Sequence, residues 1–144
     1  MTFRATTHFS IVVDVKAPPD RVFAVLCDIE RWPEWTPTMT SVRRMDDGSF
    51  AVGSRARVRQ PKLLPAVWQV TELEEKRSFT WVTRSPGIQI KARHVAEAAG
   101  AGSRVTLSLE FSGLLGPLVA RLYRNLNQRY LATEAKGLKE RSEG

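Results

Sequence analysis

The chain has 144 residues, which fits one domain with a substantial core, and we expect residues 1–144 to form a single domain. Its composition, 42% hydrophobic and 26% charged, is ordinary for a globular protein. The net charge is +7, but the basic residues are spread from Arg4 to Arg141 without a block of five or six. We therefore expect a solvated basic surface and no specific nucleic-acid partner.

The lone cysteine, Cys27, excludes an intrachain disulfide and any Cys-rich metal site. No stretch of the chain has the apolar core of a signal peptide or the length of a membrane span. We therefore expect no membrane insertion and, by default, a cytoplasmic protein.

The first elements in chain order are a strand and two short helices. Apolar and polar residues alternate over 8–16, which is typical of a half-buried strand, and the prolines after Ala17 end it. A short helix with an apolar side follows, and a second helical turn leads into the stretch 28–37. That stretch carries Trp32 and Trp35 between prolines, and it suits either a packed lid or the wall of a ligand pocket.

Six further strands are predicted from alternation and turn residues. They cover approximately 40–44, 55–60, 67–73, 79–83, 88–96 and 105–111. Because the connections are short, the strands should pair antiparallel, as in a meander.

The last long run predicts one continuous helix from about 114 to 140. Its apolar residues recur at steps of three and four and form one stripe: Leu115, Leu118, Val119, Leu122, Leu126 and Tyr130. Pro117 suits the first helical turn. Leu122 lies at the middle of the stripe and is expected to face the deepest part of the sheet. The order of elements predicts an α+β fold, with helices packed on one face of a curved antiparallel sheet.

Several stretches resemble the START-like (SRPBCC) superfamily, and within it the polyketide cyclase/dehydrase-like group. The matching residues run through 15–23, 26–28, 31–35 (Arg-Trp-Pro-Glu-Trp), 102–106 and 111–117. The resemblance implies a helix-grip: a seven-stranded sheet wrapped around a long C-terminal helix, with two short N-terminal helices, enclosing an apolar cavity. It also implies binding of lipids, hormones, polyketides or other hydrophobic molecules, and some members of the superfamily are cyclases.

The residues show no catalytic set. His8 is on the polar phase of its strand, whereas His94 is on the apolar phase and could orient a ligand or act as a general base, although a hydrogen-bonded core histidine is the simpler interpretation. No nucleophile elbow, phosphate-binding loop or dinucleotide motif is present, and two histidines without ligand spacing argue against a metal site. We expect no cofactor, and Cys27 is expected to fill space in the core.

A ligand pocket fits the residues better than a catalytic centre. The predicted ligand-binding residues are Trp35, Trp68, Phe79, Trp81, Ile90, His94, Leu107, Val119, Leu122, Tyr123 and Leu126. Further polar contacts could come from Tyr130 and Arg57, although an arginine on that strand phase usually faces solvent.

Three functions remain open from the sequence. We favour binding or transport of a hydrophobic, lipid- or polyketide-like small molecule. The second is a cyclase- or dehydrase-like enzyme, which an acid–base pair facing one cavity would favour. The third is an interaction module, which a contiguous basic face would favour.

Overall fold

The structure, a computed structural model, describes residues 7–144. Its strands are β1 (Thr7–Val15), β2 (Ser41–Arg44), β3 (Arg55–Arg59), β4 (Ala66–Glu74), β5 (Ser78–Ser85), β6 (Ile88–Ala99) and β7 (Gly102–Ser112). Its helices are α1 (Pro19–Cys27), the 3₁₀ helix η1 (Ile29–Glu34), α2 (Gly116–Leu122) and α3 (Arg124–Glu143).

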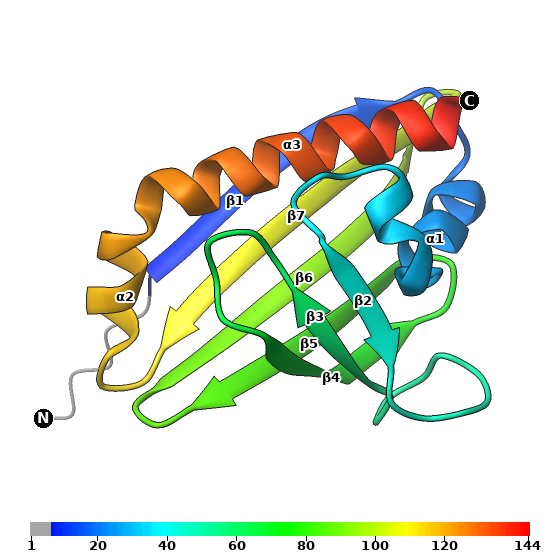
Figure 1. Ribbon diagram of the computed structural model, residues 1–144. Helices are drawn as coiled ribbons and strands as arrows, with labels where there is room; N and C mark the ends of the chain where they lie inside the picture. The colour runs from blue at the N-terminus through cyan, green and yellow to red at the C-terminus, as the bar shows by residue number, and fades with distance from the viewer. Residues whose placement is uncertain (1–6) are drawn as a thin grey trace, which may run out of the picture.

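The seven strands form one antiparallel sheet in the order β1-β7-β6-β5-β4-β3-β2. The sheet is a meander except that β1 pairs with the last strand, β7. A register shift between Val70 and Glu72 marks a bulge between β4 and β5, and bulges increase the bend of a sheet. Figure 1 shows β2, β3 and β4 curling around towards α3. The predicted helix-grip class is confirmed.

The helices close the curved sheet along one side and at both ends. α3 packs along β1 and β7, α1 packs against the C-terminal part of α3, and α2 packs against β7 (Figure 1). α1 begins at Pro19, where the missing N–H is not needed, and it buries Val22, Phe23 and Leu26. None of the helices among residues 7–144 is long and apolar enough to cross a membrane.

The prediction of one continuous helix from 114 is wrong, because the run divides at Tyr123. Tyr123 ends α2 with φ −104° and ψ 17°, outside the α-helical region, and α3 begins at the next residue. The break comes from tertiary packing, since neither proline nor glycine is present there. Gly116 lies directly on the backbone of Phe111, and the Leu115 N–H donates to the Gly87 oxygen (2.7 Å), which holds α2 at the end of the sheet.

The break also overturns the predicted position of Leu122, which is 71% exposed. With α2 turned away from the axis of α3 (Figure 1), Leu115, Leu118 and Leu122 are exposed, whereas Val119 still packs against the core. The buried stripe is carried instead by α3, through Leu126, Leu131, Ala135 and Leu138.

Candidate ligand-binding site

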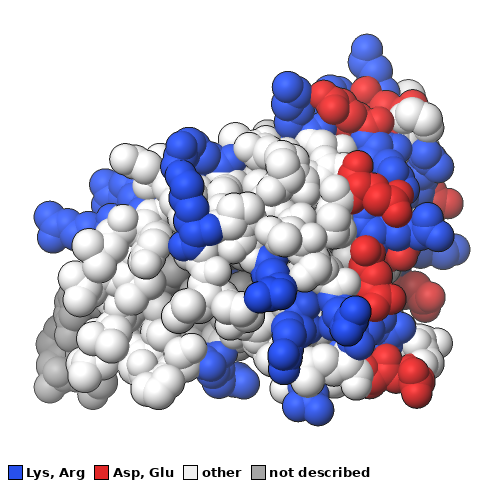
Figure 2. Space-filling view, in the orientation of Figure 1, with Lys and Arg blue, Asp and Glu red and all other residues white. Residues whose placement is uncertain are grey.

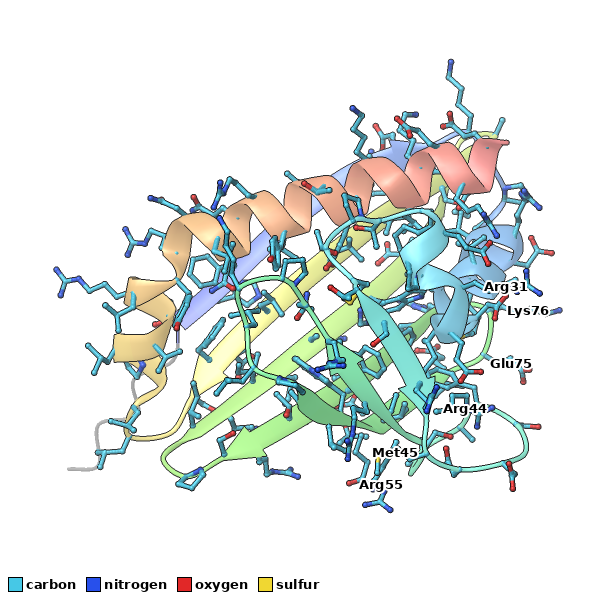
Figure 3. All side chains as sticks on the ribbon, in the orientation of Figure 1. Arg31, Arg44, Met45, Arg55, Glu75 and Lys76 are labelled. Atoms are coloured by element: carbon cyan, nitrogen blue, oxygen red, sulfur yellow. The ribbon has the colours of Figure 1, made fainter. Side chains whose placement is uncertain are left out.

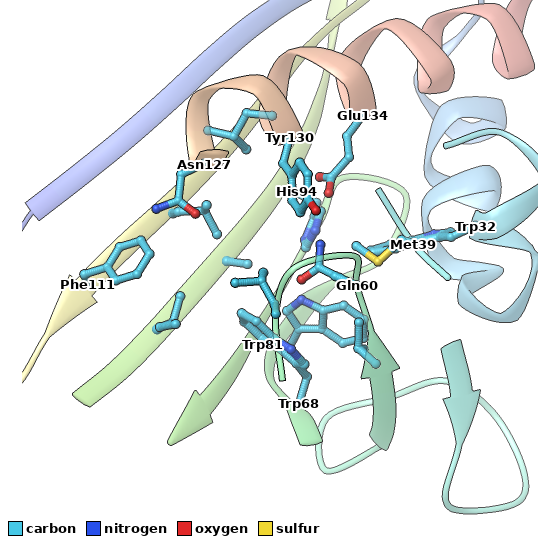
Figure 4. A pocket seen from close by; sticks show the side chains of 16 residues that line it. Trp32, Met39, Gln60, Trp68, Trp81, His94, Phe111, Asn127, Tyr130 and Glu134 are labelled. Carbon is cyan, nitrogen blue, oxygen red and sulfur yellow. The ribbon is translucent and has the colours of Figure 1, made fainter. Parts of the chain in front are cut away.

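A cavity of about 100 Å³ lies between α3 and the concave face of the sheet. Its sheet side is aromatic and aliphatic: Trp68, Trp81, Ala92, Leu109 and Phe111 line it (Figure 4). Trp68 and Trp81 come from neighbouring strands, and their ring centroids are 5.6 Å apart. The two rings are tilted by 36°, and an apolar aromatic wall of this kind suits a ligand with a ring system.

Trp32 closes one end of the cavity as part of η1. Its indole N–H donates to the Leu26 oxygen (3.0 Å), which ties η1 to α1, and its ring packs against Trp81 (5.3 Å between centroids). Trp32 is 2% exposed and lines the cavity. The Trp-rich stretch is therefore a packed lid and a cavity wall at once.

His94 faces the cavity from β6 and is 6% exposed. Its Nδ1 lies 3.2 Å from the Phe79 oxygen, and its ring stacks on Phe79 at 4.2 Å between centroids. Burial lowers the pKa of His94 to about 4, against a smaller opposite effect of the hydrogen bond to Phe79. The imidazole is therefore neutral at pH 7. Because a carbonyl only accepts, Nδ1 carries the proton and Nε2 is left as a base.

Glu134 enters the same cavity from α3 (Figure 4). Burial raises the pKa of its carboxyl group to about 7, and the hydroxyl of Thr38, which donates to Oε1 (3.0 Å), acts in the opposite direction. The Thr38 hydroxyl in turn lies 2.9 Å from that of Thr36, which is also buried. Glu134 can therefore give or take a proton near pH 7.

Asn127 lies two turns before Glu134 on α3 and is 7% exposed. Its Nδ2 is buried and has no hydrogen-bond partner among residues 7–144, although Asn127 lines the cavity (Figure 4). A buried amide without a partner costs free energy, so it calls for an explanation. An acceptor atom on a bound molecule would supply the missing partner.

The loop between β3 and β4, residues 60–65, covers the cavity on its open side. Gln60 and Leu63 line the cavity from this loop, and the Tyr130 hydroxyl donates to the Pro61 oxygen from α3. We call residues 60–65 the strap. Among residues 7–144, this hydrogen bond is the one that joins the strap to α3.

The sequence matches, over residues 6–143, the family described as polyketide cyclase / dehydrase and lipid transport. The chain belongs to this family. None of the curated proteins matches it by sequence. The resemblance inferred from the sequence is thus confirmed at the level of the family.

Solved structures share the fold of this family member at low identity. The Zhui aromatase/cyclase from Streptomyces sp. R1128 has a TM-score of 0.78 and 16% identity, covering 96% of this chain and 94% of its own. A point mutant of norcoclaurine synthase from Thalictrum flavum, in complex with a transition-state analogue, has a TM-score of 0.76 and 13% identity, covering 99% of this chain and 97% of its own. Major latex-like protein 151 from Panax ginseng has a TM-score of 0.74 and 16% identity, covering 95% of this chain and 97% of its own. Identities this low establish the fold alone.

In this family member, four of the eleven residues predicted for the ligand site line the cavity: Trp68, Trp81, Ile90 and His94. Three others are buried elsewhere, with Phe79 behind His94 and Leu107 and Leu126 packed away from the cavity. Val119 and Tyr123 line an adjoining surface groove, Trp35 lines a separate surface hollow beside Arg141, and Leu122 is exposed.

The polar residues of the cavity are largely those that the sequence analysis missed. Tyr130 was considered, but Gln60, Asn127 and Glu134 were not. Glu134 had a detectable signal, because it falls between Leu131 and Leu138 on an otherwise apolar stripe of α3. Arg57, considered as a polar contact, is exposed on β3. Within residues 7–144, no group of three His, Cys, Asp or Glu side chains could hold a metal ion.

Proposed function

We propose that the protein binds a small, flat, hydrophobic molecule that carries a hydrogen-bond acceptor, such as a carbonyl or phenolic oxygen. The observation that carries the proposal is the Nδ2 of Asn127, which has no partner among residues 7–144 and lies in the wall of an apolar, aromatic cavity. The aromatic floor provides burial, and the amide provides orientation. The family description, which names polyketides and lipids, supports the hydrophobic class.

The positions of the polar groups limit the shape of the ligand. Asn127 and Glu134 are seven residues apart on α3, which is about 10 Å along a helix axis. Polar atoms at both ends of a two- or three-ring skeleton would span that distance. The closed cavity, at about 100 Å³, has room for only part of such a skeleton. We therefore infer that binding moves the strap away from Tyr130.

The test compares two neutral probes, naphthalene and 2-acetonaphthone, which differ by one acetyl group. One hydrogen bond is worth about 1 kcal/mol, so the ketone should bind roughly fivefold more tightly than burial of its methyl group alone explains. In Asn127→Leu this preference should vanish while naphthalene still binds. Equal binding of the two probes by the parent protein, or a preference that survives the substitution, would contradict the proposal. Native mass spectrometry of the purified protein would identify a co-purified ligand.

A second candidate function is acid–base catalysis on that ligand. The observation that favours it is that Glu134 and His94 face one cavity with pKa values displaced in opposite directions, to about 7 and about 4. A carboxylate with a pKa near 7 is suited to proton transfer at neutral pH. Asn127 could donate to the oxygen of an enolate as negative charge develops there.

Hydrogen exchange at a carbon next to a carbonyl tests this second function without a known substrate. In D₂O, ionised Glu134 would remove a proton from the methyl group of 2-acetonaphthone and return a deuteron to the same carbon. NMR should then show deuterium entering the methyl group faster with the parent protein than with Glu134→Gln. Equal rates, with probe binding retained in both proteins, would leave binding without catalysis.

A further inference from the structure

The end of the molecule formed by α2 and the strap exposes large apolar side chains. We call this surface the leucine face; it comprises Leu64, Leu114, Leu115, Leu118, Leu122 and Tyr123. Leu64 is 89% exposed and Leu114 is 93% exposed. Six of the ten large hydrophobic residues exposed among residues 7–144 belong to this face. Single exposed leucines are normal, but a cluster marks an interaction site.

The leucine face adjoins the opening of the cavity. A surface groove lined by Lys62, Leu64, Val119 and Tyr123 lies beneath it. The groove and the cavity share Leu63, Ile90, Phe111 and Asn127 as lining residues. A molecule that leaves the cavity past the strap therefore emerges at the leucine face.

The charge around the leucine face has one sign. Lys62, Arg121 and Arg124 are exposed there, and none of them takes part in the ion pairs found within residues 7–144. The segments that build this end, namely the strap (60–65), the turn between β5 and β6 (83–91) and residues 111–124, contain no Asp or Glu. On the face seen in Figure 2, acidic side chains gather at the other end, over α1 and the C-terminal part of α3. Figure 3 shows the mixed charges of that end, including Arg31, Arg44 and Glu75.

We propose that the leucine face docks on the surface of an anionic lipid membrane. Leucines beside lysine and arginine are the combination that binds at the level of lipid headgroups, where apolar side chains enter the interface and cations meet lipid phosphates. The docking is peripheral and requires no spanning helix. It goes beyond the proposed ligand binding, and its test does not depend on the identity of the ligand.

Two other partners fit the leucine face less well. A symmetric dimer through this face would place Arg121 and Arg124 of two copies near one another, and like charges in a desolvated contact are costly. A nucleic acid would be expected to meet stacking aromatics, whereas the exposed apolar side chains here are leucines apart from Tyr123. An anionic bilayer can bury the leucines at its interface and pair the cations with lipid phosphates.

The first experiment measures binding of the full chain to sedimented vesicles, either pure phosphatidylcholine or a 70:30 mixture with phosphatidylserine. We expect binding to the anionic vesicles only, weakening as salt rises. Each basic residue near such a surface contributes about 1 kcal/mol, so R121Q/R124Q should lower the partition coefficient roughly 25-fold. L118S/L122S should lower it at least tenfold. The matched control Val52→Ser, which removes an exposed apolar residue from the β2–β3 loop that also carries Asp46 and Asp47, should leave it unchanged.

The second experiment locates the contact by fluorescence. Leu118→Cys, labelled with the environment-sensitive dye NBD, should shift to shorter wavelength on anionic vesicles, whereas labelled Val52→Cys should not. The native Cys27 is a poor competitor for the label, because burial raises the pKa of its thiol to about 12.

Four results would overturn the proposal. They are a failure of the parent protein to bind anionic vesicles, equal blue shifts at both labelled positions, binding unaffected by L118S/L122S, and a dimer in light scattering that the same double substitution dissociates. Thermal melts verify that the variants are folded, and none of the substituted side chains is buried. If the vesicle assay fails while the ketone probe still binds, the ligand proposal stands without the membrane proposal.

Discussion

His94 and Glu134 line the same cavity, and removal from solvent shifts their pKa values in opposite directions. Burial favours the neutral form of each group, so it lowers the pKa of the histidine to about 4 and raises that of the carboxyl to about 7. Both groups carry less charge inside the protein than they would in the unfolded chain. The stability of the protein therefore depends on pH through two opposing effects.

We predict opposite pH slopes of stability for His94→Gln and Glu134→Gln. With His94 replaced, the raised pKa of Glu134 remains, so the free energy of unfolding should fall as pH rises from 4.5 to 7. With Glu134 replaced, the lowered pKa of His94 remains, so the free energy of unfolding should rise from pH 4 to 6.5. Each change is about 3 kcal/mol, from 2.5 pKa units at 1.36 kcal/mol each.

Urea unfolding at several pH values provides the measurement. In the parent protein the two effects oppose one another between pH 4.5 and 6.5, so its stability should change less than that of either variant. Other titrating groups, such as Glu143, are present in all three proteins and cancel in the comparison. Parallel slopes in the two variants would contradict the cavity environment described for these residues.

Replacing Asn127 should make the protein more stable and its ligand binding weaker. Leucine has nearly the same shape, and it removes a buried amide whose Nδ2 has no partner among residues 7–144. Asn127→Leu should therefore raise the free energy of unfolding by about 1 kcal/mol while weakening binding of the ketone probe. Ser142, whose Oγ is likewise buried and unpartnered away from the cavity, provides the control. Ser142→Ala should be stabilising or neutral and leave probe binding intact. A loss of stability in Asn127→Leu would show that Asn127 has a structural role.

The cavity residues divide into those that the sequence could predict and those that it could not. Trp68, Trp81, Ile90 and His94 share the inward phase of their strands, and period-2 alternation assigns that face. Alternation does not distinguish a residue that lines a cavity from one behind it, which is why Phe79 and Leu107 were included. Asn127 is polar, and its burial depends on how α3 lies on the sheet.

At the scale of elements, α3 approaches η1 closely at a glycine, and helix propensities alone would not reveal this contact. Gly137 is in the middle of α3, where glycine is about 1 kcal/mol less favourable than alanine. A Cβ atom added there would meet the Trp35 oxygen at the end of η1. The glycine lets the helix lie directly on the Trp-rich lid.

We therefore predict that Gly137→Ala destabilises the protein by about 1 kcal/mol or more, although alanine has a higher helix propensity than glycine. Ala132→Gly, at an exposed position of the same helix, is the comparison and should cost about 1 kcal/mol through propensity alone. Thermal and urea unfolding of both variants provide the readout. A stabilised Gly137→Ala protein would mean that α3 and η1 do not approach as described.

The division of the C-terminal run into α2 and α3 could not be predicted from its residues. The 3.6-residue period continues through Tyr123 without proline or glycine, so local signals favour one helix. What divides it is the anchoring of α2 at the end of β7, through Gly116 on Phe111 and the Leu115 hydrogen bond to Gly87. The antiparallel pairing of β2 to β7 was easier to predict, because short turns leave few alternatives, whereas the pairing of β1 with β7 was not predicted.

At the scale of the whole molecule, the chain combines two unlike ends around one cavity. One end, at α1 and the end of α3, carries ion pairs such as Arg141 with Glu34 (2.8 Å). The other end, at α2 and the strap, carries the leucine face and cations without acidic residues in its segments. The net charge of +7 is therefore unevenly distributed, which the residue counts alone could not reveal.

The central claim, that a ligand cavity lies under α3, is tested most directly by a pair of alanine substitutions on β6. Ala92 lines the cavity and Ala96, four residues on, is buried on the same face in the filled core. Ala92→Leu should be nearly neutral in stability and abolish binding of the neutral fluorescent probe N-phenyl-1-naphthylamine. Ala96→Leu should cost roughly 1–3 kcal/mol through overpacking and leave the probe bound. Equal destabilisation by both substitutions, with no probe bound by the parent protein, would contradict the existence of the cavity.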